Sequence, residues 1–186
     1  QSYVTDSVTG LPVSSGYGDN TFKLDHNGTI ILSGTKTFGV YADNNDSAVT
    51  PVISTRVVNL NSGSLIDLSG TTTKGTGVYA NKVTVNTSGD IKIGNEGAGI
   101  YSKDSNININ GGIIELGGND STAVVLGGSS NLTATAGTVN VKGNNTIYAV
   151  GAGAVTTGLE NISVNIDPGM KVTLANVKNN TFSYDG

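Results

Sequence analysis

Short alternations of apolar and polar residues recur along the chain in three kinds of segment that follow one another in a fixed order. The first kind is a plain alternation, found at Phe22/Leu24, Val58/Leu60, Val83/Val85, Ile107/Ile109, Leu132/Ala134 and Ile162/Val164/Ile166. The second kind begins with a glycine, namely Gly28, Gly63, Gly89, Gly112, Gly137 and Gly169. The third kind joins two apolar residues, as in Val40-Tyr41, Val78-Tyr79, Ile100-Tyr101, Val124-Val125 and Ile147-Tyr148. Because a period of two is typical of strands with one buried face, each segment predicts one strand.

The spacing of the glycines gives the length of the repeat. Successive glycines lie 35, 26, 23, 25 and 32 residues apart, so one repeat takes 23–26 residues and two repeats carry insertions. Three strands per repeat predict a right-handed parallel β-helix of about six coils, because stacked coils can bury the inward side chains that one coil cannot. A β-sandwich also has short strands, spaced by about 8–12 residues, but the cyclic order of three distinct segments favours the β-helix.

The repeat also divides the chain. Residues 1–20 do not follow it, and we expect them to cover the first coil or to link it to a preceding region. Residues 21–186 are predicted to form β-helix repeats, with insertions at 43–56 and 150–161. Loops on a rigid stack are the usual place for binding, although a solenoid also tolerates an insertion that has no function.

Alternation within the glycine-led strands predicts which side chains face the core. The expected inward pairs are Ile30/Leu32, Ile66/Leu68, Ile91/Ile93, Ile114/Leu116, Val139/Val141 and Val172/Leu174. The expected outward residues are Ile31, Asp67, Lys92, Glu115, Asn140 and Thr173. Lys92 can therefore pair with Asp67 or Glu115 on the neighbouring rungs, about 4.8 Å away, although an exposed ion pair contributes only about 0–1 kcal/mol.

Composition narrows the possible functions. The net charge is −4 and only 13% of the residues are charged, so the chain offers no basic surface for nucleic acid. No apolar run reaches the roughly 20 residues of a transmembrane helix. The chain begins with Gln1 and shows no signal peptide, which indicates a mature or excised piece of a longer protein. The absence of Cys excludes disulfides and thiolate metal sites.

The residue types that perform catalysis or bind metal do not cluster along the sequence. The single histidine, His26, falls at a coil corner, where we expect a structural or solvent-facing role. Asp67 and Glu115 share a strand position, but Lys92 on the rung between them indicates alternating charge rather than a catalytic carboxylate pair. A calcium-loop pattern begins at Asp104 but lacks its glycine. We therefore predict no catalytic, cofactor or metal site, and no enzyme.

One column of the repeat is aromatic. Tyr41, Tyr79, Tyr101 and Tyr148 take the same position in four coils, and Val125 interrupts them. If the preceding aliphatic residues point inward, alternation turns these tyrosines outward into a strip that can stack on sugar rings or anchor a protein. An internal aromatic ladder, which stabilises stacked coils without a ligand, is the alternative. The candidate binding surface also includes the two nearby acids of the first insertion, Asp43 and Asp46.

The repeats resemble the passenger domains of large bacterial type V autotransporters, through the segment GTGVYANKVTVNTSGDIKIGNEGAGIYSKDSNININGGIIELGG. Its phrases G-x-G-[VI]-Y-[AS], followed by N-x-G-x-I, are similar to those of the giant RadD-like outer-membrane adhesins of fusobacteria. The resemblance covers roughly residues 26–150 and departs from the pattern at residues 123–126, Ala-Val-Val-Leu. It implies a β-helical stalk on the bacterial cell surface or outer membrane that takes part in adhesion and virulence.

The sequence therefore predicts a non-enzymatic adhesin segment that presents loops or faces to other cells. The expected partner is a glycan or protein on the surface of another bacterium or of a host cell. Two alternatives stay open, namely a carbohydrate-active β-helix, such as a polysaccharide lyase, hydrolase or tailspike part, and a spacer that binds nothing. We expect no nucleic-acid partner and no membrane span.

Overall fold

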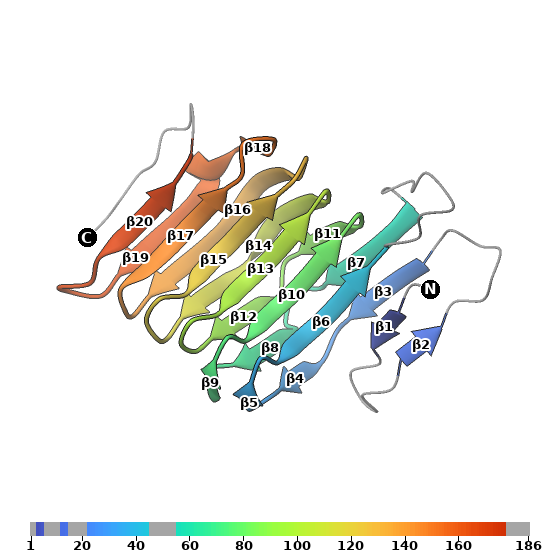
Figure 1. Ribbon diagram of the computed structural model, residues 1–186, viewed down its shortest axis with the longest axis horizontal. Coiled ribbons are helices and arrows are strands. Elements are labelled where there is room, and N and C mark those ends of the chain that lie inside the picture. Colours follow the sequence, from blue (N-terminus) through green and yellow to red (C-terminus); the bar gives the residue numbers. More distant parts are fainter. Residues whose placement is uncertain (1–2, 6–11, 15–21, 45–54, 178–186) are drawn as a thin grey trace.

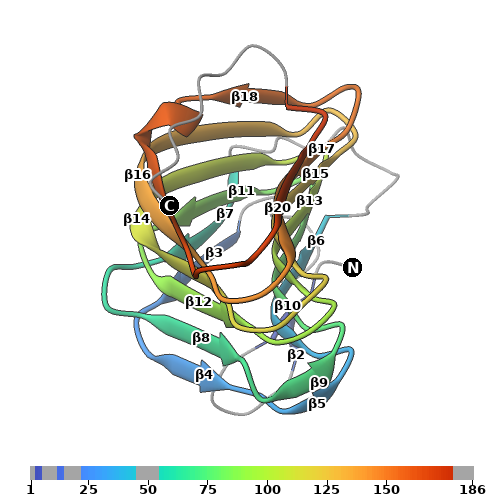
Figure 2. The ribbon, with the colours of Figure 1, turned by 90° about the vertical axis from the view of Figure 1, so that its left-hand side faces the viewer.

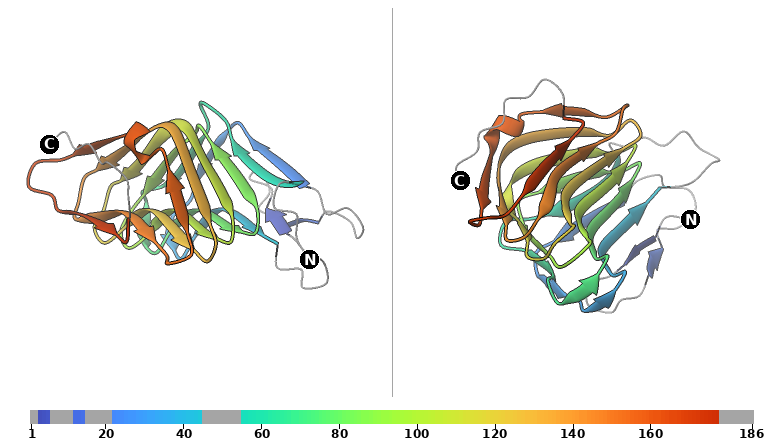
Figure 3. Two further views of the ribbon diagram at one scale, coloured as in Figure 1. Left: turned by 90° about the horizontal axis from the view of Figure 1, so that it is seen from above. Right: turned by 60° about the vertical axis from the view of Figure 1, so that its left-hand side comes forward.

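The computed structural model describes residues 3–5, 12–14, 22–44 and 55–177. They form a right-handed parallel β-helix, as the repeat predicts, with about five turns instead of the expected six. The coils stack side by side, with the coil that begins at residue 22 at one end and the coil that ends at residue 177 at the other (Figures 1 and 3). A view along the stack shows that each coil runs over three faces (Figure 2).

Each face is a parallel array with one strand per coil. The first face contains β3 (Phe22–His26), β7 (Arg56–Leu60), β11 (Thr84–Thr87), the first halves of β14 (Asn106–Leu116) and β16 (Asn131–Val141), and β18 (Val155–Thr157). The second face contains β4 (Thr29–Ile31), β8 (Leu65–Leu68), β12 (Asp90–Ile93), the second halves of β14 and β16, and β19 (Ile162–Ile166). The third face contains β6 (Phe38–Asp43), β10 (Thr76–Asn81), β13 (Ala98–Lys103), β15 (Thr122–Gly127), β17 (Asn145–Val150) and β20 (Val172–Ala175). We call this third face the tyrosine sheet.

A few elements lie outside the three faces. β5 (Gly34–Thr35) pairs with β9 (Thr71–Thr73) at a corner of the first two coils, and the 3₁₀ turn η2 (Leu159–Asn161) precedes β19. β1 (Tyr3–Thr5) and β2 (Pro12–Ser14) form an antiparallel pair, and β1 lies against β6. The other residues of 1–20 and residues 45–54 of the expected insertion at 43–56 lie outside the described residues. A capping or linking role for residues 1–20 stays a prediction.

Inward side chains form one continuous apolar core along the stack. The predicted inward pairs Ile66/Leu68, Ile91/Ile93, Ile114/Leu116 and Val139/Val141 are all buried. Their outward neighbours are in register from coil to coil, in the predicted order Asp67, Lys92, Glu115 and Asn140. Since each buried aliphatic side chain contributes about 1.5–3 kcal/mol, this column provides the main stabilisation of the stack.

The last coil differs from the prediction. The segment after Gly169 was expected to be a glycine-led strand with Val172 and Leu174 inward and Thr173 outward, but it forms β20 of the tyrosine sheet, and Leu174 is 37% exposed. β19 takes the expected place, so that Asn165 follows Asn140 in the outward column. The segment 150–161, which was expected to be an insertion, contains β18, which continues the first face of this coil, and η2, which leads into β19. The glycine of the long corner at residues 167–171, Gly169, resembles the start of a glycine-led strand in the sequence, and this explains the wrong prediction.

Outward asparagines stabilise the first face by hydrogen bonding from coil to coil. The Nδ2 of Asn59 donates to Asp25 Oδ1 (2.7 Å), that of Asn86 to Asn59 Oδ1 (2.8 Å) and that of Asn108 to Asn86 Oδ1 (2.8 Å). The hydrogen bond from Asn59, together with Lys23, lowers the pKa of Asp25. The asparagine side chains follow the same register as the core residues beneath them, and their hydrogen bonds make the face rigid.

Three charged or titratable residues that the sequence singled out have structural surroundings. His26 is buried, and its Nε2 lies 3.4 Å from the carbonyl oxygen of Leu65, so its role is structural. Glu115 forms its ion pair with Lys142 (2.9 Å) rather than with Lys92. Asp67 accepts hydrogen bonds from the backbone and the hydroxyl of its neighbour Ser69, and these overcome the effect of burial and lower its pKa.

Candidate binding surface

The tyrosine sheet places three of the four predicted tyrosines in one outward column. Tyr41, Tyr79 and Tyr101 are paired directly with one another across β6, β10 and β13. The aliphatic residue before each of them is buried, as predicted. The outward orientation predicted for these three tyrosines is therefore confirmed.

A pair of consecutive inward residues in each strand sets this orientation. In β10, Gly77 and Val78 are both buried, between the outward residues Thr76 and Tyr79. A Cβ on Gly77 would lie 2.5 Å from the carbonyl oxygen of Gly99 and 2.5 Å from Ile91 Cγ2. Only glycine fits at such a close approach, because real Cβ atoms do not come this near to a backbone oxygen. The glycine thus allows the coils to stack closely beneath the tyrosines.

The three tyrosine rings stack on one another along the axis of the solenoid. The ring centroids of Tyr41 and Tyr79 are 4.8 Å apart with an interplanar angle of 6°, and those of Tyr79 and Tyr101 are 5.7 Å apart at 7°. Phe38 lies edge-on to Tyr41 (5.5 Å, 82°) and to Tyr79 (6.1 Å, 85°). We call these four residues, Phe38, Tyr41, Tyr79 and Tyr101, the aromatic strip. Stacked and T-shaped pairs at such distances each contribute about 0.5–1.5 kcal/mol.

The stacking decides which parts of the strip a partner can reach. Both faces of Tyr79 are covered by its two neighbours, so that its ring edge and hydroxyl are left for contact. Phe38 and Tyr101 are the most exposed members, at 44% and 39%. Beyond Tyr101 the column continues as Val125 and then Ala149, and the aromatic surface ends there.

Asp43 is joined to the strip by hydrogen bonds. The hydroxyl of Tyr41 donates to Asp43 Oδ2 (3.0 Å), and the amide of Asn81 donates to Asp43 Oδ1 (2.7 Å). Burial and the hydrogen bond to this carboxylate raise the pKa of Tyr41 to about 12. Burial, followed by the charge of Asp43, also raises the pKa of Tyr79. The hydroxyls of Tyr41 and Tyr79 therefore remain neutral donors and acceptors at physiological pH. Asp46 lies outside the described residues.

Tyr148 is not part of the strip, and its predicted outward position is wrong. It pairs with Val124, an inward residue, and is only 1% exposed. Ile147 is also buried, in the place that Gly77 and Gly99 take in earlier coils, so Ala149 becomes the outward residue. The corner before β17 is one residue shorter than the corner before it, and this shift could not be recognised from the apolar pattern.

Phe38 is the member of the strip that the alternation did not predict. Strict alternation from Val40 would turn Phe38 inward, but Gly39 and Val40 point inward together, so Phe38 points outward. The signal in the sequence is the glycine that precedes the aliphatic residue in β6, β10 and β13.

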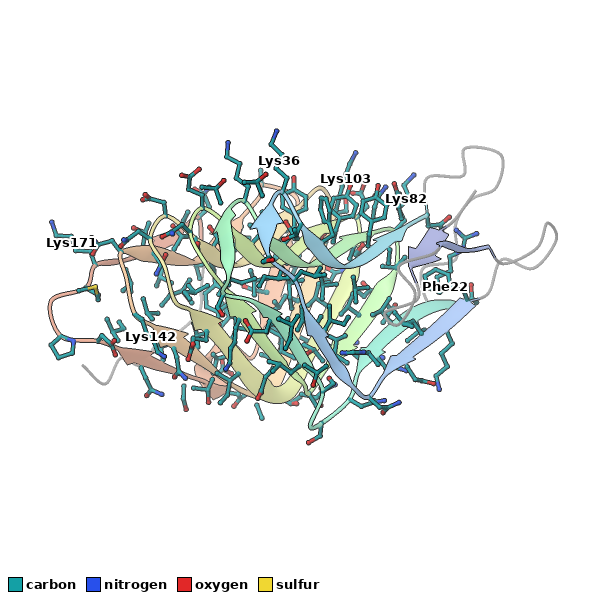
Figure 4. All side chains as sticks on the ribbon, turned by 90° about the horizontal axis from the view of Figure 1, so that it is seen from below. Phe22, Lys36, Lys82, Lys103, Lys142 and Lys171 are labelled. Carbon is teal, nitrogen blue, oxygen red and sulfur yellow. The ribbon has the colours of Figure 1, made fainter. Side chains whose placement is uncertain are left out.

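Lysines border the aromatic strip. Lys36, Lys82 and Lys103 extend from the same edge of the molecule (Figure 4). Lys103 follows Tyr101 by two residues and pairs in register with Asn81, the residue that binds Asp43. Lys36 and Lys82 occupy corners with φ values of 55° and 54°. Lysines therefore lie near the strip, together with the carboxylate of Asp43, which is already hydrogen-bonded.

Neither the described residues nor comparisons with other proteins assign a known function to this surface. Within the described ranges, no three His, Asp or Glu side chains come close enough to hold a metal ion. No helix among the described residues is long and apolar enough to cross a membrane. No protein-family model, curated protein or solved structure matches the chain.

Proposed function

We propose that the chain is a non-enzymatic segment of a bacterial cell-surface adhesin, of the autotransporter passenger type, and that the aromatic strip binds a protein on another cell. The observation that carries the proposal is the strip itself, with Phe38 and Tyr101 exposed on a sheet that is held in register by its core. Aromatic side chains are the residues that most often dominate the energy of protein interfaces.

The arrangement of the rings favours a protein partner over a sugar. A sugar ring binds an aromatic residue through the face of the ring, but the inner faces of the stacked tyrosines cover one another. What remains is the outer face of Tyr101 and a row of ring edges and hydroxyls, beside an exposed phenylalanine and the lysine border. Such a surface offers apolar contact together with hydrogen bonds, which suits the mixed surface of a protein.

The solenoid supports this role as a rigid carrier. Each coil adds about 4.8 Å along the axis, and the asparagine hydrogen bonds between coils keep neighbouring rungs in register. A rigid stack holds the strip in one orientation, so little conformational entropy is lost when a partner binds.

Binding of the fluorescently labelled chain to bacterial and host cells tests the proposal. We expect saturable binding that Phe38→Ser and Tyr101→Ser each weaken about 5- to 30-fold, since loss of an exposed aromatic anchor costs about 1–2 kcal/mol. Val125 already occupies the position of Tyr101 in the next coil, so the fold tolerates loss of this ring.

Ile31→Ser and Val155→Ser are the matched controls, because they remove exposed apolar side chains from other faces of the solenoid. We expect the controls to bind like the unmodified chain. If the chain binds no cells, or if all four variants bind equally well, the segment is a spacer and the proposal is wrong.

A further inference from the structure

A polar groove opens at the corner that leads into the tyrosine sheet, close to the last coil. Its volume is about 290 Å³, and it is lined by Asp120, Asn144, Asn145, Thr146, Lys171 and Thr173. We call it the corner groove. It lies in the coils beyond Tyr101 and contains no residue of the aromatic strip. Lys171 is at the opposite end of the molecule from Phe22 (Figure 4).

Unequal corner lengths create the groove. The register pairs Leu116 with Val141 and Ile166 before the corner, and Thr122 with Thr146 and Thr173 after it. The segments between these paired positions are therefore residues 117–121, 142–145 and 167–172, which are five, four and six residues long and include the first residues of β17 and β20. The shortest corner lies between two longer ones, and a recess results where its missing residue would project.

Some of the polar groups in the recess are available to a ligand, and others are already hydrogen-bonded. The side chain of Asn145 is fully engaged, because its Oδ1 accepts from the amide of Ser121 and its Nδ2 donates to the carbonyl of Gly118. Asn144 Oδ1 accepts from the amide of Lys171 (2.8 Å), and its NH₂ group has no hydrogen-bond partner in the described part of the chain. Asp120 and Lys171 are exposed, and neither forms an ion pair with any residue that the structure describes.

The side chains that line the corner groove favour an uncharged ligand. One carboxylate and one ammonium group give the groove no net charge, so Asp120 opposes an anion and Lys171 opposes a cation. The hydroxyls of Thr146 and Thr173 and the NH₂ group of Asn144 supply neutral hydrogen bonds. Sugar hydroxyls both donate and accept, so they can donate to Asp120 and accept from Lys171 at once.

We infer that the corner groove binds a neutral saccharide, with Asp120 and Lys171 as the groups that contact its hydroxyls. Its volume lies at the small end of ligand sites, which range over about 300–1,000 Å³, and this suits one or two sugar units. Exposed hydrogen bonds exchange with water at little net gain, so the expected affinity is weak, in the millimolar range. The inference does not rest on the aromatic strip or on its protein partner.

Titration of the ¹⁵N-labelled chain with glucose, galactose, mannose, N-acetylglucosamine and glucuronic acid, followed by NMR, tests the inference. We expect at least one neutral sugar to shift the amide signals of Thr146, Lys171 and Thr173. Asp120→Asn and Lys171→Met should each weaken this binding about tenfold, the factor expected for one hydrogen bond to a charged group. Asn tolerates the positive φ of 58° at position 120, so this variant keeps the corner intact.

Glu96→Gln and Lys74→Met are the matched controls, since both residues occupy corners of earlier coils with similar positive φ values and do not line the groove. We expect neither to change the titration. The inference is overturned if no neutral sugar shifts these signals, if the controls weaken binding equally, or if only glucuronic acid binds. Phe38→Ser should leave the sugar titration unchanged, so failure of the groove and failure of the strip are seen separately.

Discussion

Replacement of Tyr148 by phenylalanine is expected to stabilise the solenoid. Tyr148 is 1% exposed, and its hydroxyl has no hydrogen-bond partner among the residues that the structure describes. Tyr148 and Thr87 both line a small cavity of about 10 Å³, and the Thr87 hydroxyl is likewise buried without a partner in the described part of the chain. Neither hydroxyl therefore has a hydrogen bond to another described residue that would offset the cost of its burial.

Two opposing effects set the expected change in the free energy of unfolding. Burial of a hydroxyl without a partner costs about 1–3 kcal/mol, which Tyr148→Phe recovers. The void left by the oxygen costs about 24 cal/mol per Å³, so an enlargement of roughly 20 Å³ takes back about 0.5 kcal/mol. The variant should therefore raise the free energy of unfolding by about 0.5–2.5 kcal/mol. With an m-value of about 2 kcal/mol per M, the urea midpoint should rise by about 0.3–1.2 M.

Urea unfolding followed by circular dichroism measures this shift, and Thr87→Val should act in the same direction. A fall in the midpoint of Tyr148→Phe would refute the reasoning, because it would mean that the hydroxyl has a partner in solution. The pH dependence gives a second check. Burial raises the pKa of Tyr148, so its contribution to stability is complete below its unfolded pKa of about 10 and is lost as pH rises toward the folded value. Tyr148→Phe should flatten the loss of stability above pH 10.

Further variants test the stacking and the strip. Gly77→Ala should destabilise by about 1–3 kcal/mol, since its Cβ would meet a backbone oxygen of the next coil at 2.5 Å. Gly28→Ala, which has open space around it, should not destabilise, and equal urea midpoints of the two variants would contradict this packing. Asn86→Ala breaks two hydrogen bonds between coils and should cost about 1–2 kcal/mol, whereas an unchanged midpoint would show that they do not stabilise the face. Asp43→Asn should lower the pKa of Tyr41 from about 12 toward 10 in an absorbance titration at 295 nm, and an unchanged titration would mean that the hydrogen bond does not form.

The sequence predicted most of the architecture because the fold repeats. Each coil supplies an independent copy of the same alternation, so the inward positions of Ile66, Ile91 and Ile114 support one another. The outward direction of Tyr79 and Tyr101 followed from the same reasoning. A period seen several times is a stronger signal than any single strand, because an error in one coil conflicts with its neighbours.

The wrong predictions concern positions where the alternation of inward and outward residues shifts by one residue. Two consecutive inward residues in β6 turn Phe38 outward, and a corner shortened by one residue moves Tyr148 into the core. A shift of one residue exchanges the two sides of a strand, so local alternation cannot reveal it without the register of the neighbouring coil. The corner groove depends on the lengths of three corners that come together only in the stacked structure.

Binding of the labelled chain to cells whose surface proteins or glycans have been removed tests the central proposal most directly. Target cells are treated with protease or with periodate, and the chain is compared with a Phe38→Ser/Tyr101→Ser double variant. The proposal predicts that protease removes the difference between the two chains, while periodate leaves it in place. A difference that survives protease and disappears after periodate would show that the aromatic strip recognises glycan, and would contradict the proposed protein partner.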